Sequence, residues 1–600
     1  MQRPNRDRGS YSIRTGRTQP TLPGATLPTA PIVAHPQHYP EEPQMPRHPA
    51  GKRPHPARRA FLQLLGLGTL LEALLLALYP LLAGATPKND AAKQALIGLF
   101  PWLPRLYWTT TFPAVAQILS HVPIFDPSNG GSNTGGGNAN LLLVLLALAF
   151  VIMLIASRTG SRVVRERLSR TGIRVLFTTI TILTLIFSIT CFFAPPVMSQ
   201  GIFLYGLYGR LVTVYHVNPF VASLSAYPHD LLQNGIVKGI PLPGLTTSGP
   251  VWIDLSIPVV LLARNSVANI MLGFRSIGLA AHLIDTVLVW VVLAKLKPET
   301  RVSATLLYGW NPLVLLLSIS GMHQETVIVL FILLAIIFFQ RKSPILGWVL
   351  MLLAMLINML FLLLLPLFFR LLGKEARTLR LGRRILWWLA VTAISGVVVV
   401  LAYAPYWQSW GTTGLLTSVR QTFLQANAIN SLDAALLTLP LRLPPALSWL
   451  IVPGHWIIFA AITVGVLLLL GTWLSDNVEL VVVFSSWVSL ALLIFMPAYW
   501  PWFAILPLVL ALCSTSRRTI MLAMLLAVGA LGSYYFWLWQ PTWPGQALVT
   551  VGLPLLLWGW ILFFTSTWEM THANEQPLEP AVQPQSRRGL SRPSWPRRRM

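Results

Sequence analysis

The stretch "SISGMHQETVIVLFILL" (residues 318–334) places His323, Gln324 and Glu325 side by side in an otherwise apolar segment. Polar and ionisable groups cost free energy at membrane depth, so they are rare there and usually functional. Apolar runs of similar character recur along the chain, and many reach the ~17–25 residues that a spanning helix requires. The stretch therefore predicts two membrane helices joined by a polar turn.

The composition favours a membrane protein over a soluble one. Of the 600 residues, 54% are hydrophobic and only 10% are charged, whereas about a quarter are charged in soluble proteins. The net charge of +25 does not indicate nucleic-acid binding, because Lys and Arg lie in the tails and in short loops between apolar runs. Both cysteines, Cys191 and Cys513, lie in apolar runs, so no disulfide framework or cysteine metal site is predicted.

The spacing of the apolar runs predicts an all-α, polytopic bundle of about 14 crossings (roughly 12–14), with interfacial helices in the outer loops. One apolar run is too long for a single helix and is expected to break near Asn358. The chain divides into a disordered basic tail, a transmembrane hairpin with an external Gly/Asn-rich linker, a transmembrane core with external loops, C-terminal transmembrane helices and a second disordered basic tail, at residues 1–57, 58–172, 173–515, 516–571 and 572–600.

The distribution of Lys and Arg predicts the orientation. The loops 158–174 and 370–384 are rich in arginine, and basic loops remain in the cytoplasm. An even number of crossings then places both termini on the same, cytoplasmic side. Three long loops poor in Lys and Arg are expected on the outer side, at residues 84–140, 195–267 and 405–455.

A second polar cluster lies in the outer loop, in "MSQGIFLYGLYGRLVTVYHVNPF" (198–220). Tyr205, Tyr208, Arg210 and His216 are candidate substrate-binding residues here, because aromatic faces suit sugars and arginine suits phosphate oxygens. His323 and Gln324 are expected to bind the same substrate across a shared outer cavity. The alternative interpretations are an interfacial aromatic belt for the first cluster and a solvated turn for the second.

The order of the motifs resembles the membrane glycosyltransferases of the GT-C class, and within it the bacterial polyprenol-phosphate-mannose-dependent mannosyltransferases. The likeness covers roughly residues 173–515 and follows five motifs in order: "SQGIFLYGLYGRL…NPF", "SGPVW", "YGWNPLVLLLSISGMHQE", "APYWQSWG" with "NSL", and "YWPWFAILPL". The resemblance implies a membrane enzyme that moves a sugar, mannose above all, from a polyprenyl-phosphate donor to an extracytoplasmic glycan or lipid acceptor.

The resemblance also implies a carboxylate base at the start of the first outer loop, where this chain has Gln200 and Gly201. We therefore expect Asp230 and Glu325 to be the catalytic acids, with Arg210 beside the donor phosphate. A divalent metal ion at the site is a further expectation, with its ligands open. Other acidic candidates are Asp254 in the outer loop and Asp285, which lies three residues from His282 on one face of an apolar span and could equally form a structural pair with it. Glu72 in the first span is expected to face a helix partner or the interface.

Two other function classes compete with the enzyme. A catalytically inactive relative would bind a lipid-linked glycan or a partner protein, and the missing acid favours it. A secondary transporter would show internal repeats and polar groups at mid-membrane, which the sequence lacks. In either surviving class the expected location is the bacterial plasma membrane, with the polar clusters on the outer side, contacts to membrane lipid and no nucleic-acid partner.

Overall fold

Helices account for all the regular structure in the described part of the chain. The computed structural model describes residues 56–85, 91–122, 136–165, 170–195, 201–233, 248–409, 431–432, 435, 456–496, 499–514, 516–539 and 545–573. These helices belong to one unit, Pro54–Met600. The all-α prediction is therefore confirmed, while the two predicted tails fall almost wholly outside the described residues.

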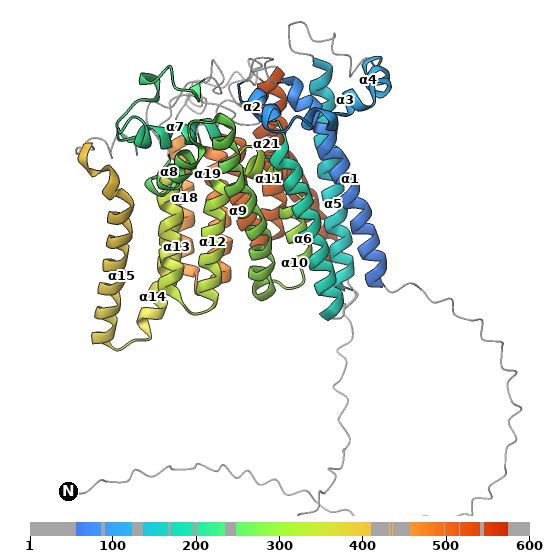
Figure 1. The fold of residues 1–600 in the computed structure, drawn as a ribbon. Helices are drawn as coiled ribbons and strands as arrows, with labels where there is room; N and C mark the ends of the chain where they lie inside the picture. Colours follow the sequence, from blue (N-terminus) through green and yellow to red (C-terminus); the bar gives the residue numbers. More distant parts are fainter. Residues whose placement is uncertain are drawn as a thin grey trace, which may run out of the picture. The chain divides into compact units, whose positions relative to one another are not determined.

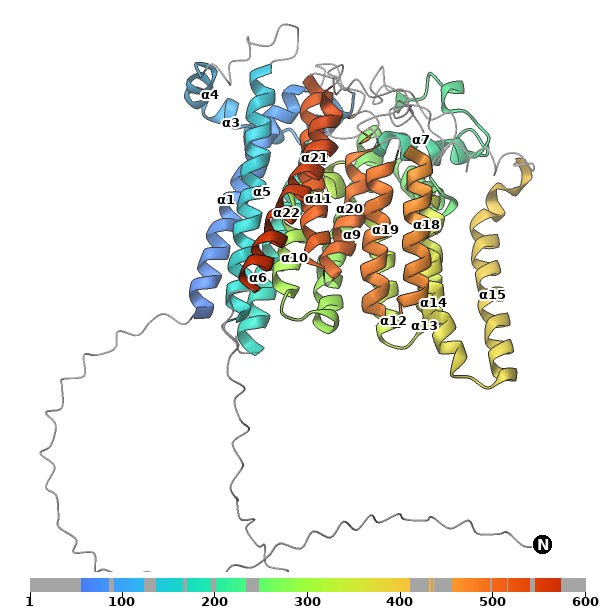
Figure 2. The same ribbon diagram turned by 180° about the vertical axis from the view of Figure 1, so that it is seen from behind.

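Seven helices in the described part are long and apolar enough to cross a membrane, and they run side by side (Figures 1 and 2). They are α1 (Pro56–Ala85), α5 (Gly136–Arg165), α6 (Arg170–Phe193), α9 (Val267–Leu296), α15 (Leu381–Tyr403), α19 (Val478–Phe495) and α21 (Arg517–Trp539). Shorter apolar helices include α12 (Glu325–Gln340), α13 (Pro344–Ile357), α18 (Trp456–Leu474), α20 (Ile505–Cys513) and α22 (Leu553–Ala573). The polytopic fold is confirmed, and the count of about 14 crossings stays a prediction.

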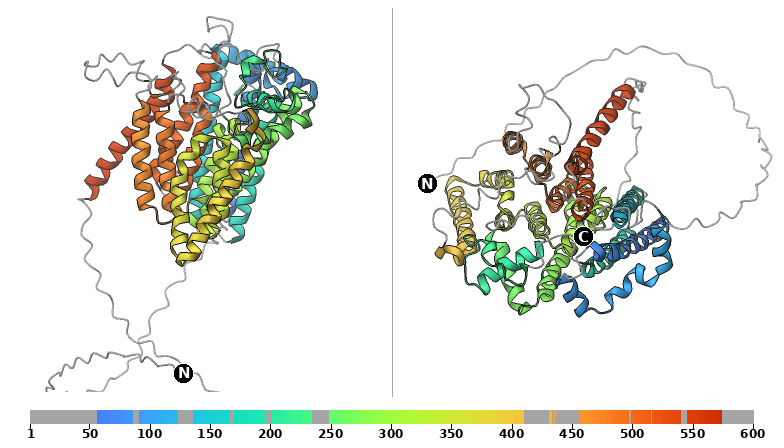
Figure 3. Two further views of the ribbon diagram at one scale, coloured as in Figure 1. Left: turned by 90° about the vertical axis from the view of Figure 1, so that its left-hand side faces the viewer. Right: turned by 90° about the horizontal axis from the view of Figure 1, so that it is seen from above.

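Short helices gather at one end of the long ones. They are α2 (Ala91–Leu99), α3 (Trp108–Thr111), α4 (Pro113–Ser120), α7 (Gly201–Thr213) and α8 (Pro250–Ala263) (Figure 1). All five come from the loops predicted to be external. The long helix α15 lies at the edge of the bundle (Figure 3), and its Leu386, Leu389 and Leu401 side chains are exposed, as expected for a helix that faces lipid.

The apolar segment that precedes the polar turn forms a broken helix. It consists of α10 (Arg301–Gly309), α11 (Pro312–Leu315) and a π-helical turn, η5 (Leu316–Ser320), and its two halves are bent by 46°. Pro312 has no backbone N–H to continue the hydrogen-bond ladder. The Asn311 side chain instead accepts a hydrogen bond from the Leu313 N–H at 3.0 Å and begins the second half.

The break predicted near Asn358 is confirmed. Helix α13 ends there, and a 3₁₀ turn, η6 (Met359–Leu364), leads into α14 (Leu365–Arg377). The last carbonyls of a helix have no partner within it. The Ile357 carbonyl accepts a hydrogen bond of 2.7 Å from the N–H of Gly249, the residue that precedes α8. The break thus anchors the outer-loop helix α8 against the bundle.

Because the backbones are so close here, adding one methyl group at Gly249 is expected to lower the stability of the protein strongly. A Cβ on Gly249 would lie 2.1 Å from the Leu356 carbonyl oxygen, a backbone atom that cannot rotate away. Gly249→Ala is expected to destabilise the protein by at least about 1–3 kcal/mol. Gly396→Ala is the matched control, because no atom lies within 4 Å of its added Cβ. Unfolding in mixed micelles measures both, and equal midpoints for the two variants would contradict the anchor.

Several predicted loops are shorter in the structure than expected. Helix α5 continues to Arg165 and α6 begins at Arg170, so much of the predicted loop 158–174 is helical. Likewise α14 continues to Arg377 and α15 begins at Leu381, within the predicted loop 370–384. The end of the predicted Gly/Asn-rich linker is helical from Gly136, and the rest of the linker lies outside the described residues. Arginine favours helices, so an arginine-rich end extends a helix beyond its apolar run.

Candidate active site

Helix α7 is held close to its neighbours by two glycines. A Cβ on Gly206 would lie 2.7 Å from Leu232 and 3.0 Å from Ile270, and one on Gly209 would lie 3.0 Å from the Ser256 backbone oxygen. Glycines spaced three apart lie on one face of a helix, so α7 approaches α8 and α9 along that face. Most α7 side chains are therefore buried, including Tyr205, Tyr208 and Arg210.

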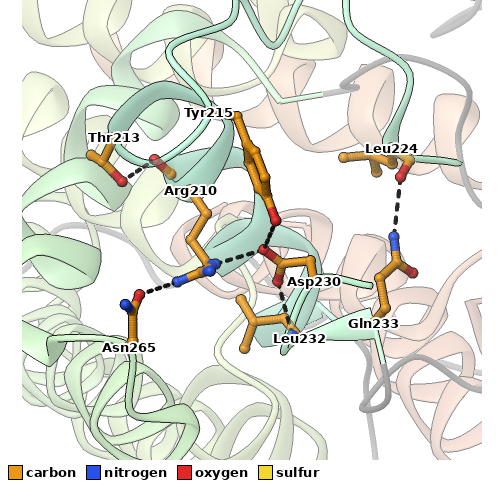
Figure 4. A network of polar contacts seen from close by, with 9 residues as sticks. Arg210, Thr213, Tyr215, Leu224, Asp230, Leu232, Gln233 and Asn265 are labelled. Carbon is orange, nitrogen blue, oxygen red and sulfur yellow. Dashed lines mark hydrogen bonds and ion pairs between the residues drawn. The ribbon is translucent and has the colours of Figure 1, made fainter. Parts of the chain in front are cut away.

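Arg210 and Asp230 form a buried ion pair (Figure 4). The Arg210 Nε donates to the Asp230 Oδ2 at 2.7 Å, and Nη1 donates to the side-chain oxygen of Asn265. The Asp230 carboxylate also accepts from the Tyr215 hydroxyl at 2.9 Å and from the Leu232 N–H at 2.9 Å. Desolvation raises the pKa of Tyr215, and its hydrogen bond to Asp230 raises it further, so the hydroxyl stays protonated as a donor.

The pairing changes how the two predicted roles are to be viewed. From the sequence, Asp230 was predicted to be a catalytic base and Arg210 to bind the donor phosphate. In the structure each satisfies the other, and three donors already occupy the carboxylate. A group engaged in this way is poorly placed to take a proton from a substrate. The geometry assigns the pair to the support of the outer loop, and the catalytic roles stay predictions.

Tyr205 brings α7 to the turn at residues 321–324. Its hydroxyl lies beside the Gln324 backbone and within electrostatic reach of Glu325. Its ring packs edge-on against Trp252 of α8, with the ring centres 5.0 Å apart. Burial raises the pKa of Tyr205 well above its usual value, and Glu325 raises it further. The expected approach of the two polar clusters is seen at Tyr205, whereas the shared cavity stays a prediction.

The other predicted binding residues of the loop differ from one another in exposure. Tyr208 is buried within α7, close enough to Tyr205 to affect it electrostatically. His216 is exposed just beyond the end of α7 and has a left-handed backbone, with φ of 53°. His216 thus lies at the surface, while the tyrosines face the interior.

The turn itself is compact and strained. The π-helical η5 ends at Ser320, the His323 N–H donates to the Leu317 carbonyl at 3.1 Å, and α12 begins at Glu325. Between them Met322 has φ of 41°, a left-handed value that costs free energy for a residue with a side chain. Single π-helical turns often occur at functional sites.

The three polar side chains of the turn are buried, and most of their polar atoms have no hydrogen-bond partner in the described part of the chain. His323 and Glu325 have no exposed surface, and Gln324 is 5% exposed. Neither ring nitrogen of His323 and neither carboxylate oxygen of Glu325 has a hydrogen-bond partner among the described residues. The neighbouring Gln324 amide lies near the carboxylate without hydrogen-bond geometry. Buried polar groups are normally paired, so such a cluster indicates a site that receives a polar ligand.

An aromatic stack borders this cluster. The His323 ring is parallel to the Trp502 ring, with centres 4.0 Å apart and 12° between the planes. Trp502 in turn stacks on Trp500, at 5.1 Å and 8°. Both tryptophans belong to the motif "YWPWFAILPL", but they were not predicted to be site residues. The density of aromatic residues next to a proline was the only signal available.

Residues 109–374 match a family model described as "Alpha-(1->6)-mannopyranosyltransferase, N-terminal domain". This segment, which is less than half of the chain, is similar to a mannosyltransferase-family domain. The resemblance predicted from the motifs is thereby confirmed. No curated protein matches the chain. The domain and the apolar helices together support a membrane mannosyltransferase.

Every site residue predicted from the sequence lies inside the mannosyltransferase-family segment. Trp500 and Trp502 lie beyond its last residue, 374, yet Trp502 reaches back to stack on His323. The C-terminal helices of the chain thus complete the surroundings of the turn that the family segment supplies.

The other acidic candidates have partners of their own. Asp254 of α8 accepts a hydrogen bond of 2.6 Å from the Tyr406 hydroxyl. Asp285 accepts from Tyr308 at 2.9 Å, while the His282 Nε2 lies 3.3 Å from the Gly309 carbonyl oxygen. His282 and Asp285 therefore support the broken helix individually, and no hydrogen bond joins them in the described structure.

Glu72 of α1 accepts a hydrogen bond from the Thr190 hydroxyl of α6, so it too has a partner away from the turn. The described residues contain no group of three or more His, Cys, Asp or Glu that could hold a metal ion. Of the acids named here, Glu325 is the one whose carboxylate oxygens both lack a partner among the described residues.

Proposed function

We propose that this protein transfers mannose from a polyprenyl-phosphate donor to a glycan or lipid acceptor on the outer side of the bacterial plasma membrane, forming an α-(1→6) linkage. The family match supports the sugar and the linkage. The single observation that carries the proposal is Glu325: a buried carboxylate whose two oxygens have no hydrogen-bond partner among the described residues, at a turn that Tyr205 and Trp502 border.

The proposed reaction needs one proton acceptor and one site for the leaving phosphate. The acceptor hydroxyl attacks the anomeric carbon, the bond from that carbon to the phosphate oxygen breaks, and polyprenyl phosphate leaves with the electron pair. The Glu325 carboxylate takes the hydroxyl proton as the new glycosidic bond forms. His323, Gln324 and Tyr205 would hold sugar hydroxyls, and the Trp502 stack supports an apolar sugar face.

An apolar groove supports a lipid donor. It lies between α8 and α9, has a volume of about 310 Å³ and is lined mostly by apolar side chains: Leu255, Pro258, Val259, Leu262, Ala263, Asn269, Gly273 and Ile277. Such a lining suits an isoprenoid chain, because it offers almost no hydrogen-bonding groups. The turn that follows α8 contains Asn265, whose side-chain oxygen accepts a hydrogen bond from Arg210. The polar outer loop therefore adjoins one end of the groove.

The proposed orientation predicts opposite labelling of two sites. Gln117 in α4 and Thr378 after α14 are both exposed. With an impermeant thiol reagent on intact cells, Gln117→Cys should react and Thr378→Cys should react only after permeabilisation, because arginine-rich ends remain in the cytoplasm. The reverse pattern would place the polar turn on the cytoplasmic side and contradict the proposed acceptor location.

The direct test of function is transfer by the purified protein. The full chain in lipid nanodiscs, given polyprenyl-phosphate [¹⁴C]mannose and an α-mannoside acceptor, should form a product that an α-(1→6)-specific mannosidase cleaves. The competing function, a catalytically inactive relative that binds lipid-linked glycan, draws support from the absence of an acid at Gln200 and Gly201. It predicts donor binding without product, and an active Gly201→Asp or Gln200→Asp variant.

A further inference from the structure

Arg275 is a buried cation with no carboxylate partner in the described structure. It lies in α9, it has no exposed surface, and it forms no ion pair with a described residue. Its guanidinium donates to neutral oxygens only: Nε to the Ser320 carbonyl at 3.2 Å, Nη2 to the Ser320 hydroxyl at 3.3 Å, and Nη1 to the Phe192 carbonyl at 2.7 Å. Burying an unpaired charge is costly, so these contacts need a functional explanation.

Both carbonyls belong to the ends of helices. Phe192 lies in the last turn of α6, and Ser320 is the last residue of η5. Carbonyls at a helix C-terminus lack intrahelical partners and carry partial negative charge, which a cation neutralises. Arg275 therefore joins two chain ends that lead into the two polar segments: α6 leads into the outer loop that contains α7, and η5 leads into the turn that contains His323.

Helix α9 contacts the same turn again one helical turn later. A Cβ on Gly278 would lie 2.1 Å from the Ser318 carbonyl oxygen and 2.6 Å from the Met322 sulfur. Residues three apart lie on one face of a helix, so Arg275 and Gly278 present a single surface to η5. This surface covers Met322, the residue with the left-handed backbone, and holds the strained turn in place.

We propose that Arg275 is a positioning residue for the transferase site. By clamping the outer ends of α6 and η5, it sets the separation of the outer loop and the turn, and so the place of Glu325. Arginine suits this role because its planar fork reaches two carbonyls at once, whereas lysine offers a single point charge. The part of the proposal that concerns catalysis rests on the proposed function; the clamp itself does not.

The clamp is tested without any transfer reaction. Thr326 follows Glu325 and is fully buried, so Thr326→Cys in a Cys191→Ala background reports the packing of the turn. Adding Arg275→Gln should speed its reaction with a small thiol reagent by about tenfold or more, through local opening. The buried Cys513 is the internal control and should keep its slow rate. An unchanged rate at position 326 would overturn the clamp.

Transfer kinetics test the positioning role. Displacement of a catalytic group by ~1 Å can cost about 10²-fold in rate. Arg275→Gln should lower kcat by roughly that factor with the donor KM nearly unchanged, and Arg275→Lys should restore part of the loss. Ser276→Ala is the control on the same helix, because Ser276 is exposed and its hydroxyl donates to the Leu272 carbonyl of that helix. Wild-type kcat in Arg275→Gln would overturn the proposal.

A milder variant covers the case in which Arg275→Gln unfolds the protein. Ser320→Ala removes only the hydroxyl that receives Nη2 and leaves the carbonyl bond. It should lower kcat a few-fold at an unchanged unfolding midpoint. If Ser320→Ala transfers like the wild type, or if reactivity at positions 326 and 513 rises together, Arg275 only stabilises the fold. If no variant and no wild type transfers mannose, the proposed function fails while the thiol result still decides the clamp.

Discussion

Glu325→Gln is expected to reduce mannosyl transfer by roughly 10²–10⁴-fold, the usual loss when a general base is removed. The amide keeps the size and polarity of the side chain but cannot accept the hydroxyl proton. Both carboxylate oxygens lack partners among the described residues, so the substitution breaks no hydrogen bond within that part of the chain. Turnover of polyprenyl-phosphate mannose and the unfolding midpoint, measured on the same nanodisc preparation, give the result.

A second glutamate in an apolar helix, the half-buried Glu72, provides the control. Glu72 lies in α1 and accepts a hydrogen bond from Thr190, far along the chain from the turn. Glu72→Gln removes the same charge from a similarly apolar setting and should leave turnover close to that of the wild type. If Glu325→Gln keeps wild-type turnover, another group takes the proton. If both variants lose the same activity, the effect comes from removing a carboxylate charge anywhere in the bundle, and the position of Glu325 is not special.

The break at Asn358 and the polar turn before Glu325 were predictable from the sequence because both depend on neighbours in the chain. A run too long for one helix must break, and adjacent polar residues in an apolar run mark a turn or a site. The approach of Tyr205 to Gln324 followed from the side of the membrane on which each segment begins. These inferences needed only periodicity and the distribution of arginine.

The contacts that distinguish the site depend instead on packing between distant segments. Trp502 lies far from His323 in the sequence. The packing of α20 against α12 brings their two rings together. In the sequence Arg275 is one polar residue in an apolar span. Its acceptors include two backbone carbonyl groups, which a pattern of side chains cannot predict. Helix ends provide binding groups that sequence motifs do not display.

The Arg210–Asp230 pair shows that residue type alone leaves two interpretations open. An arginine and an aspartate in one outer loop suit phosphate binding and base catalysis, and they equally suit each other. Their separation of 20 residues spans an irregular segment whose path no periodicity specifies. The choice between the two interpretations follows from burial and from the extra donors, Tyr215 and Leu232 N–H, that complete the carboxylate's shell.

A structural role for the ion pair predicts that substitutions of Arg210 and Asp230 affect stability in a coupled way. Asp230→Asn should destabilise the protein by about 3–5 kcal/mol, because it leaves the buried Arg210 cation without its partner. The asparagine oxygen can still accept from the Leu232 N–H, so the loss reports the charge pair. Arg210→Met should cost less, since Tyr215 and Leu232 continue to donate to the carboxylate. The measurement is equilibrium unfolding in mixed micelles.

The double variant separates structure from catalysis. In Arg210→Met/Asp230→Asn neither charge is left unpaired, and the new amide can donate to the Tyr215 oxygen, so the combined loss should fall short of the sum by about 2 kcal/mol. Additive losses would mean that the ion pair contributes nothing. If the double variant folds and keeps most of its kcat, the ion pair only supports the outer loop. If the double variant folds but transfers no mannose, Asp230 or Arg210 takes part in the chemistry, and the assignment of the base to Glu325 alone is incomplete.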